Sequence, residues 1–475
     1  MQKNVFRIGL VFGIIVMLVG MGIIPSIVGV KKEKTTITTL DSPGYIQDLI
    51  DNASDGDTIY IPSGIYYENI IINKSISLIG EDKNTTIIDG NGSLDVVYVY
   101  ADWVNITGFT IQNSYRVIDL RSNTSFCTIK GNNIKEYEGE GISIEHGGNI
   151  IIIDNNIISN YGSGIRQKWT KNNTISGNFI SNCSSGIYSW VNSNSNFTDN
   201  IISYTNGEAI YLEDSNYINI CHNVIDGCDS GISGGLHERI KNNNISYNTI
   251  TSNKYCGINL IGSNNNIIGN YISNNMDGIQ FRVGNNDNIL GNNILGNNIT
   301  LNDRYGIYLG LGYFFTEYYY NVSGNTIISN NWSGIYLNSI HNSYITGNMI
   351  SNNTVGINSS YLSNNNIIYH NNFIDNMYNA HEARDNIWDD GKYGNYWSDY
   401  KEKYPFAIRS LLKPWMWNIP YEIEGRDNKD NCPLIKQWPN PRGRTIPRNK
   451  ALFNIHPILL WLFERFPILR HLLGL

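Results

Sequence analysis

Residues 164–188 read Gly-Ile-Arg-Gln-Lys-Trp-Thr-Lys-Asn-Asn-Thr-Ile-Ser-Gly-Asn-Phe-Ile-Ser-Asn-Cys-Ser-Ser-Gly-Ile-Tyr, and this stretch decides the fold. A Gly-Ile pair opens the stretch and returns after 22 residues, at Gly186. Between the two pairs, Asn178 precedes a short apolar pair, and a polar turn follows. A unit that returns at a fixed period of roughly 20–50 residues indicates a solenoid when its neighbours carry the same pattern.

The pattern recurs along the middle of the chain, with spacings mostly of 21–23 residues and insertions that give 26 or 28. The Gly-Ile pairs begin at Gly141, Gly164, Gly186, Gly231, Gly257, Gly278, Gly306, Gly334 and Gly356, and Ala209-Ile210 fills the one gap. We assign the asparagine before the apolar pair to Asn133, Asn156, Asn178, Asn200, Asn223, Asn248, Asn270, Asn293, Asn325, Asn348 and Asn372. These side chains are expected to form one column, bonded from coil to coil as a ladder.

A unit of this length holds three short strands and three turns, and it is too short for a pair of helices that buries itself. Stacked at about 4.8 Å, such coils pair every backbone group with the coils above and below. Asparagine suits the turns because it tolerates the left-handed conformation. The sequence therefore predicts an all-β, single-stranded parallel β-helix of ten or so coils.

Composition agrees with this fold and excludes one class of partner. The chain holds 72 Asn and 45 Gly residues, which is typical either of Asn-rich disorder or of a solenoid with many tight turns. Isoleucine at fixed spacing favours the solenoid, because disordered segments lack aliphatic residues. The formal net charge is −7, so no basic face is expected for nucleic acid.

Residues 1–34 are interpreted as a signal or membrane anchor. Lys3 and Arg7 precede an apolar run over residues 8–30, and three lysines follow it. The run is long enough to span a bilayer and longer than the usual core of a signal peptide. An uncleaved anchor and a cleaved signal both remain open. Either one places the rest of the chain outside the cytoplasm, at the cell surface or secreted.

Residues 35–400 are expected to hold the β-helix with its caps. Ser42-Pro43 has the form of a helix start, and a helix there would cover the first coil with Ile46, Leu49, Ile50 and Ala53. Strands are expected at 58–61, 69–72 and 76–79, and the aromatic segment 387–400 is the expected C-terminal cap.

Residues 401–475 form a Pro-rich tail, with nine of the twelve prolines. Its short apolar runs at 458–463 and 468–473 could dock on the end of the helix, lie on a membrane surface or meet a partner.

Two segments carry a family resemblance. Residues 56–66 (Gly-Asp-Thr-Ile-Tyr-Ile-Pro-Ser-Gly-Ile-Tyr) with 74–80 resemble the opening of pectin-lyase-like right-handed β-helix proteins. The repeats, with Trp388-Asp389 and residues 394–400, resemble the NosD-like surface group. The family name implies copper delivery, but the chain shows no Met-rich cluster or paired Cys or His spacing for copper. No metal site and no cofactor are expected.

The resemblance also implies an enzyme hypothesis, because proteins of this fold cleave or epimerise acidic polysaccharides. Of the polygalacturonase motifs only Arg239-Ile240-Lys241 occurs, and the Asp-Pro-His motif of alginate-type enzymes is missing. His222 and His370 stand just before repeat asparagines, so a place in the turns is the simpler interpretation. The six cysteines form no CxxC pair, and most are interpreted as small buried residues.

The register of the repeat predicts a surface patch. Residues two and four after each Gly should face outward, because the Ile after the Gly faces inward. The column at +4 reads Glu145, Lys168, Trp190 and Glu213 over four coils, and the column at +2 adds Arg166, Tyr188 and Tyr211. We expect these seven residues to bind a polysaccharide or a glycoprotein glycan. The simpler alternative is a solvated face on which Glu145 pairs with Lys168.

Two functions follow from this pattern. The preferred one is a non-catalytic, surface-anchored or secreted protein that binds extracellular carbohydrate or serves as a structural module. The alternative is a calcium-dependent polysaccharide lyase or hydrolase, in which Glu213-Asp214 would hold calcium and Arg166 or Lys168 would act on a uronate.

Overall fold

The computed structural model describes residues 44–439, except 122, 160, 236–239, 284–290, 312–318 and 426. The chain divides into a unit of residues Met1–Thr38 and a unit of residues Thr39–Leu475, and all described residues belong to the second. The expected anchor, the Ser42-Pro43 helix start and the apolar runs after residue 440 lie outside the described residues. No helix within the described ranges is both long and apolar enough to cross a bilayer.

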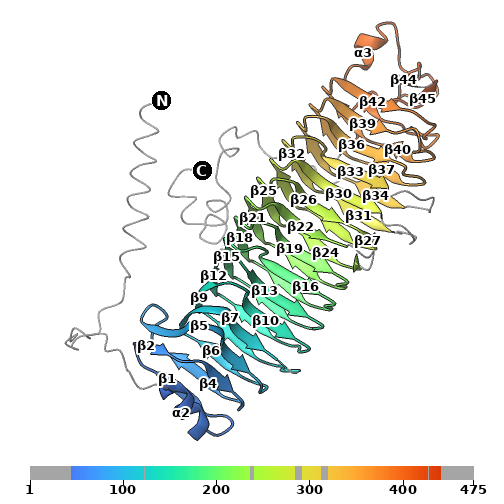
Figure 1. Ribbon diagram of the computed structural model, residues 1–475. Coiled ribbons are helices and arrows are strands. Elements are labelled where there is room, and N and C mark those ends of the chain that lie inside the picture. Colours follow the sequence, from blue (N-terminus) through green and yellow to red (C-terminus); the bar gives the residue numbers. More distant parts are fainter. Residues whose placement is uncertain are drawn as a thin grey trace, which may run out of the picture. The chain divides into compact units, whose positions relative to one another are not determined.

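The second unit is a parallel β-solenoid in which each regular coil supplies three strands (Figure 1). One strand from each coil joins a 14-stranded sheet. Its members are β1 (Thr58–Ile61), β4 (Ser77–Gly80), β6 (Asn105–Thr107), β8 (Thr128–Lys130), β11 (Ile151–Ile153), β14 (Thr174–Ser176), β17 (Asn196–Thr198), β20 (Asn219–Cys221), β24 (Asn244–Ser246), β28 (Asn266–Ile268), β31 (Asn292–Leu295), β34 (Tyr320–Ser323), β37 (Tyr344–Thr346) and β40 (Ile367–Tyr369).

The strands that carry the Gly-Ile pairs form a second column, which we call the Gly-Ile sheet. It starts from β3 (Ile70–Ile72) and the long strands β5 (Thr86–Val99) and β7 (Thr110–Leu120). It continues through β10 (Glu140–Glu145), β13 (Ser163–Lys168), β16 (Ile187–Trp190), β19 (Glu208–Glu213), β22 (Ser230–Gly234), β26 (Cys256–Leu260), β30 (Asp277–Val283), β33 (Ile307–Leu311), β36 (Ser333–Asn338), β39 (Val355–Ser359) and β42 (Tyr378–Glu382).

The third column joins the Gly-Ile sheet only through β5 and β7, which are long enough to run through both. Its own strands are β2 (Gly64–Tyr67), β9 (Asn133–Tyr137), β12 (Asn156–Ile158), β15 (Phe179–Ser181), β18 (Ile201–Ser203), β21 (Val224–Asp226), β25 (Thr249–Thr251), β29 (Tyr271–Ser273), β32 (Asn298–Thr300), β35 (Thr326–Ile328), β38 (Met349–Ser351), β41 (Asn372–Ile374) and β43 (Tyr396–Trp397). A short pair, β23 (Ile240–Lys241) with β27 (Gly262–Ser263), lies outside the three columns.

The predicted parallel β-helix is confirmed, but it has about fourteen coils where ten or so were expected. The difference lies at the N-terminal end, where β3, β5 and β7 build the Gly-Ile sheet before Gly141 without a Gly-Ile pair. Isoleucine forms the core throughout, and Ile165, Ile187 and Ile210 have no exposed surface. One or two apolar side chains per strand fill the narrow interior.

A buried asparagine ladder runs through the turn between the 14-stranded sheet and the third column. Each side-chain amide donates to the side-chain oxygen of the next asparagine over 2.9–3.2 Å. The rungs are Asn132, Asn155, Asn178, Asn200, Asn223, Asn248, Asn270, Asn297, Asn325, Asn348, Asn371 and Asn395.

Four members of the predicted column were therefore assigned wrongly. Asn133, Asn156 and Asn372 each stand one residue after a rung, at the start of a strand of the third column, and Asn372 is buried there against the backbone of Trp438. Asn293 belongs to β31 of the 14-stranded sheet, where its amide donates to Asn266. A second ladder, of Asn253, Asn275, Asn302, Asn330, Asn353 and Asn376, fills the turn before the Gly-Ile sheet.

The first coil is covered by helix α2 (Tyr45–Asn52), as expected, with Ile46 and Ile50 fully buried. The helix begins after Gly44, and the carboxylate of Glu68 accepts hydrogen bonds from the first N–H groups, at Ile46 and Gln47. A carboxylate at this position satisfies free donors and complements the helix dipole. The cap is thus held by a side chain from the coil that it covers.

The last coil is covered by aromatic side chains. Trp397 of β43 lies between Phe373 and Tyr421, with ring centroids 4.3 and 4.1 Å away and nearly parallel planes. The chain after residue 400 continues through α3 (Tyr400–Lys403) into the antiparallel pair β44 (Tyr421–Ile423) and β45 (Asn428–Asp430). Asp430 is fully buried and accepts hydrogen bonds from the indole of Trp397 and the backbone N–H of Asn395.

Candidate functional site

The seven residues predicted to bind carbohydrate lie on one face, the outer face of strands β10, β13, β16 and β19 of the Gly-Ile sheet. Arg166, Tyr188 and Tyr211 are direct neighbours from coil to coil. The second column runs Glu145, Lys168, Trp190 and Glu213 in the same register. All seven side chains are partly exposed, whereas Ser143, at the +2 position of the first coil, is buried between Asp119 and Arg166.

Two tyrosines and one carboxylate form the centre of this face. The rings of Tyr188 and Tyr211 stack with centroids 5.3 Å apart, and the Tyr188 hydroxyl donates to Glu213 over 2.8 Å. Partial burial, assisted by Glu213, raises the pKa of Tyr211 to about 12 and that of Tyr188 further. Both phenols therefore stay neutral at physiological pH and can donate a hydrogen bond. The carboxylate of Glu213 is held in place as the acceptor of the Tyr188 hydroxyl.

A cation and three neighbouring rings border the tyrosines. The Lys168 ammonium lies 3.6 Å from Glu145 and 4.4 Å from the ring centre of Trp190. It also lies 3.7 Å from the ring centre of Trp169, which stacks on His146 and meets Trp190 at an angle of 35°. The predicted ion pair is confirmed, and the cation–π contacts add to it. Lys168 therefore fixes the orientation of the indoles.

Trp169 and His146 were not predicted for this site, although their positions carry a signal. Both stand at +5, one residue beyond the columns considered, and both have positive φ angles of 53° and 57°. A left-handed residue turns the chain away from the strand and leaves its ring lying over the sheet edge. The face also includes Glu140, which lies 3.5 Å from Arg166.

An open trough of about 500 Å³ continues from the tyrosines toward the C-terminal coils. Tyr188, Tyr211 and Glu213 line one end and Arg282 lines the other. Its floor between them is built from small side chains, including Ser233 and Gly234. Glu208, another residue that the sequence did not single out, lines the same trough. The face thus offers flat rings, hydrogen-bonding groups and a channel along the stack of coils.

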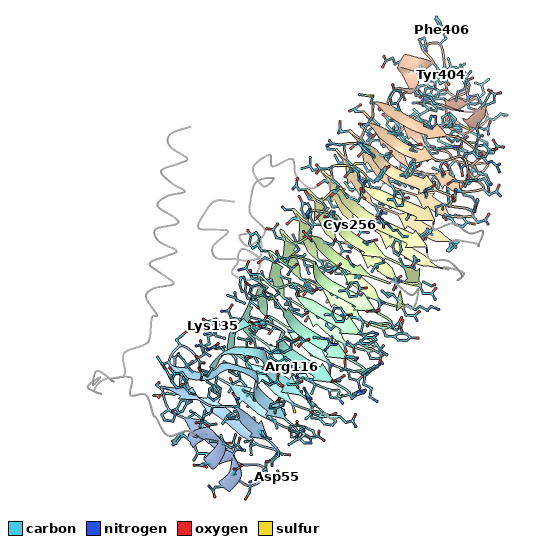
Figure 2. The ribbon with its side chains drawn as sticks, viewed as in Figure 1. Asp55, Arg116, Lys135, Cys256, Tyr404 and Phe406 are labelled. Atoms are coloured by element: carbon cyan, nitrogen blue, oxygen red, sulfur yellow. The ribbon has the colours of Figure 1, made fainter. Side chains whose placement is uncertain are left out.

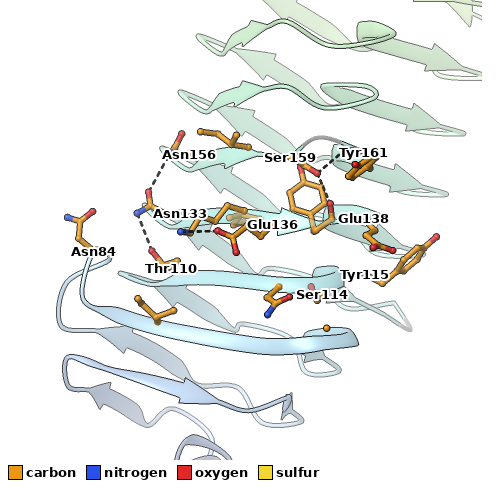
Figure 3. A pocket seen from close by; sticks show the side chains of 17 residues that line it. Asn84, Thr110, Ser114, Tyr115, Asn133, Glu136, Glu138, Asn156, Ser159 and Tyr161 are labelled. Atoms are coloured by element: carbon orange, nitrogen blue, oxygen red, sulfur yellow. Dashed lines mark hydrogen bonds and ion pairs between the residues drawn. The ribbon is translucent and has the colours of Figure 1, made fainter. Parts of the chain in front are cut away.

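A larger hollow of about 800 Å³ lies beside β9 on the third column, where Glu136, Glu138, Tyr115 and Tyr161 surround it (Figure 3). Many of its polar groups already bond to one another across coils. Asn133 donates to Thr110 over 3.3 Å, and Ser159 donates to the carbonyl of Tyr137 over 2.7 Å. We therefore regard the trough of the Gly-Ile sheet, with its stacked rings, as the better candidate site.

Two family models match this chain. The right-handed β-helix region matches residues 116–268, and the periplasmic copper-binding protein NosD matches residues 291–402. The parallel coils and the first match define a right-handed β-helix protein. The second match covers C-terminal coils, where the chain is similar to NosD. Comparison with curated proteins found no significant match.

The residues that the structure describes do not fit the copper site that the family description implies. Within the part of the chain that the structure describes, no three His, Cys, Asp or Glu side chains converge in a way that could hold a metal ion. This includes Glu213 and Asp214, the pair considered for calcium. The six cysteines are free thiols, and all except Cys221 are buried.

Several solved structures are distantly similar. The mannuronan C-5 epimerase AlgE6 A-module of Azotobacter vinelandii is 15% identical with a TM-score of 0.45, over 72% of this chain and 91% of that one. The Dettilon tailspike protein is 15% identical with a TM-score of 0.43, over 65% and 60%. A DFA-IIIase from Arthrobacter chlorophenolicus A6 is 13% identical with a TM-score of 0.35, over 70% and 88%. None of these likenesses assigns a substrate to this chain.

Proposed function

We propose that this protein binds carbohydrate non-catalytically outside the cytoplasm, through the outer face of β13, β16 and β19. The observation that carries the proposal is the stack of Tyr188 on Tyr211 beside Trp190, at the head of an open trough. Sugar rings present apolar C–H faces to aromatic rings, and their hydroxyls need polar partners. Glu213, Glu208 and Arg282 supply such partners along the trough.

The charges favour a neutral sugar chain over an acidic one. Lys168 is paired with Glu145, and Arg166 is paired with Glu140. Glu208 and Glu213 line the trough and would repel a polyanion. Because the sheet is rigid, little order is lost on binding. If each ring contact contributes about 1 kcal/mol, a short sugar would bind with micromolar to millimolar affinity.

The location rests on two observations. The apolar run over residues 8–30 has basic residues on both sides, and the NosD family model is described as periplasmic. We infer that the β-helix is exported and that the N-terminal segment tethers it to a membrane or directs its secretion. Protease added to intact cells should digest the β-helix. Full-length protein recovered from the cytosol, protected from protease, would contradict this location.

The binding proposal is tested by affinity electrophoresis in gels that contain mannan, xylan, polygalacturonate or alginate. The wild-type protein should be retarded in at least one of the neutral gels. Trp190→Ala with Tyr211→Ala should weaken the retardation strongly, whereas Trp190→Phe with Tyr211→Phe should keep most of it. Tyr60→Ala with Tyr67→Ala is the matched control, because it removes two exposed rings from a distant coil. Unchanged retardation of the Trp190→Ala, Tyr211→Ala protein would contradict the proposed site.

The proposal that binding is non-catalytic rests on the distance between two carboxylates of this face. Glu145 and Glu213 are three coils apart, or about 14 Å at the strand spacing. The carboxylates of glycosidases lie about 5–9.5 Å apart, so this pair cannot act together on one bond. Incubation of the protein with polygalacturonate and alginate, with and without calcium, should release no unsaturated product. Release of such products would favour the lyase alternative.

A further inference from the structure

A second group of aromatic rings lies on the Gly-Ile sheet, farther toward the C-terminus. Tyr305 stacks on Tyr336 with centroids 5.1 Å apart and an angle of 12°, and both contact Tyr308 at 5.4–5.5 Å. Trp332 meets Tyr305 edge to face at 5.5 Å, and half of its surface is exposed. We call these four residues the second platform, and Tyr188, Trp190 and Tyr211 the first platform.

An ion pair holds the second platform in place. The Nε and Nη2 groups of Arg304 each donate a hydrogen bond to the carboxylate of Asp277, whose side chain is fully buried. The guanidinium carbon lies 5.7 Å from the ring centre of Tyr305 and 5.9 Å from that of Trp332. A two-point bond to a buried carboxylate fixes the plane of an arginine. The rings beside it are therefore preorganised, as Lys168 preorganises Trp190 of the first platform.

The two platforms share one register. From Tyr211 the column continues through Ser233, Asn259 and Gln280 to Tyr308, one coil at each step. Tyr336 follows in the next coil. Four coils separate Tyr211 from Tyr308, which is about 19 Å at the strand spacing. Both platforms thus lie on one line along the outer face of the same sheet.

The trough fills the interval between the platforms. It runs from Tyr188 and Tyr211 to Arg282, which is the direct neighbour of Gly310 in the next coil. A Cβ on Gly310 would lie 2.2 Å from the ring of Tyr308, so this ring occupies the space that a side chain at residue 310 would need. The second platform therefore begins one coil beyond the end of the trough. Small side chains line part of the middle of the trough, and a platform lies at or just beyond each of its ends.

We propose that the two platforms bind a single polysaccharide chain that lies along the trough, parallel to the axis of the solenoid. This inference rests on the proposed function and specifies its ligand as a polymer, not a mono- or disaccharide. A short sugar can contact one platform only. A long chain contacts both, and the second contact is then made at a high effective concentration. Affinity should therefore rise steeply once the chain spans both platforms.

The test uses the full chain and defined-length fragments, of about three and about twelve sugar units, of mannan, xylan, polygalacturonate and alginate. Titration calorimetry should show two short fragments of the bound series per protein. It should show one long fragment per protein, bound at least about 100-fold more tightly than a short fragment. Trp332→Ala with Tyr336→Ala should reduce the short fragments to one per protein and lower the affinity for the long fragment about 100-fold. Trp332→Phe with Tyr336→Phe should behave as the wild type, and circular dichroism checks that each variant is folded.

The outcomes separate this inference from the proposed function. If the first-platform variant loses all binding while the second-platform variant binds the long fragment as tightly as wild type, the single-chain inference is wrong and the proposed function stands. Two long fragments per wild-type protein would also overturn the inference, because each platform would then hold its own chain. If no fragment of any series binds, both the inference and the proposed function fail.

Discussion

Asn178 donates a hydrogen bond from its side-chain amide to the side-chain oxygen of Asn200, one coil further, over 3.0 Å. The backbone N–H of Asn178 donates to the same oxygen over 3.0 Å, and the amide also reaches the carbonyl of Ile152. Both side chains are buried. Each rung of the ladder thus satisfies backbone groups in a turn that water cannot reach.

Removal of one rung should be costly for this reason. In Asn200→Ala, the backbone and side-chain donors of Asn178 lose their acceptor, and we expect the free energy of unfolding to fall by about 2–4 kcal/mol. Asn206→Ala, an exposed turn residue in the following turn of the same coil, is the matched control and should change it by less than about 0.5 kcal/mol. Urea denaturation followed by circular dichroism measures both. Equal stability of the two variants would show that the ladder contributes little.

The C-terminal cap should weaken as the pH rises. Burial raises the pKa of Asp430 to about 7, although three N–H groups donate to its carboxylate. Below the unfolded pKa, near 3.8, the carboxyl group is neutral in both states. As pH rises toward 7, the unfolded chain ionises first, so the stability that Asp430 contributes is lost progressively over this range.

Melting temperatures between pH 4 and 8, followed by tryptophan fluorescence, measure this effect. Asp430→Asn should be less stable than wild type at pH 4 and should show a flatter pH dependence, while the exposed Asp427→Asn should follow the wild type. His370, whose pKa burial lowers, and Glu382, whose pKa burial raises, titrate in all three proteins. The difference between the curves therefore isolates Asp430. Parallel curves for the wild type and Asp430→Asn would contradict the assignment.

The aromatic cap should be essential to the last coils. Trp397 is 1% exposed and lies between Phe373 and Tyr421, so Trp397→Ala leaves a cavity and should cost about 3–5 kcal/mol. Phe406, at the tip of the cap, is 91% exposed and points into solvent (Figure 2). Phe406→Ala is therefore the control and should leave the melting temperature unchanged. If both variants have the melting temperature of the wild type, the aromatic cap does not stabilise the C-terminal end of the β-helix.

The thiols should react in a defined order. Burial raises the pKa of Cys127 and of Cys183 to about 11, and both side chains have no exposed surface. Cys221 is the one cysteine that is not buried. Iodoacetamide should label the folded protein at Cys221 alone and the unfolded protein at all six cysteines, as mass spectrometry can determine. Labelling of fewer than six thiols after unfolding without reductant would indicate a disulfide.

The fold could be predicted because the repeat period and the regular spacing of the inward-facing isoleucines can be identified in the sequence. The ladder was assigned in part wrongly because asparagines occur in adjacent pairs, such as Asn132 with Asn133. The structure shows that the rung stands two residues before a buried strand residue, as Asn132 does before Ile134. The offset alone does not select a rung, because Asn292 also stands two residues before a buried residue, Ile294, and belongs to another coil-to-coil series with Asn265. The first coils were expected from their own strands, at 58–61, 69–72 and 76–79, but the number of coils was set too low because it was taken from the Gly-Ile pairs that start at Gly141.

The columns of the first platform were also predictable, since strand alternation decides which side chains face outward. The contribution of Trp169 was not, because a left-handed turn residue folds its ring back over the sheet. The second platform was missed because Tyr305 precedes its Gly-Ile pair and insertions separate its coil from the earlier repeats. Only the three-dimensional register places Tyr308 in line with Tyr211.

The most direct test of the central claim is a crystal structure of the β-helix soaked with the long fragment that it binds. The account predicts a sugar chain along the Gly-Ile sheet, with rings stacked on Tyr211 and Tyr336 and the chain passing over Ser233. A chain bound in the hollow beside Glu136 and Glu138, or one lying across the coils on another sheet, would contradict it.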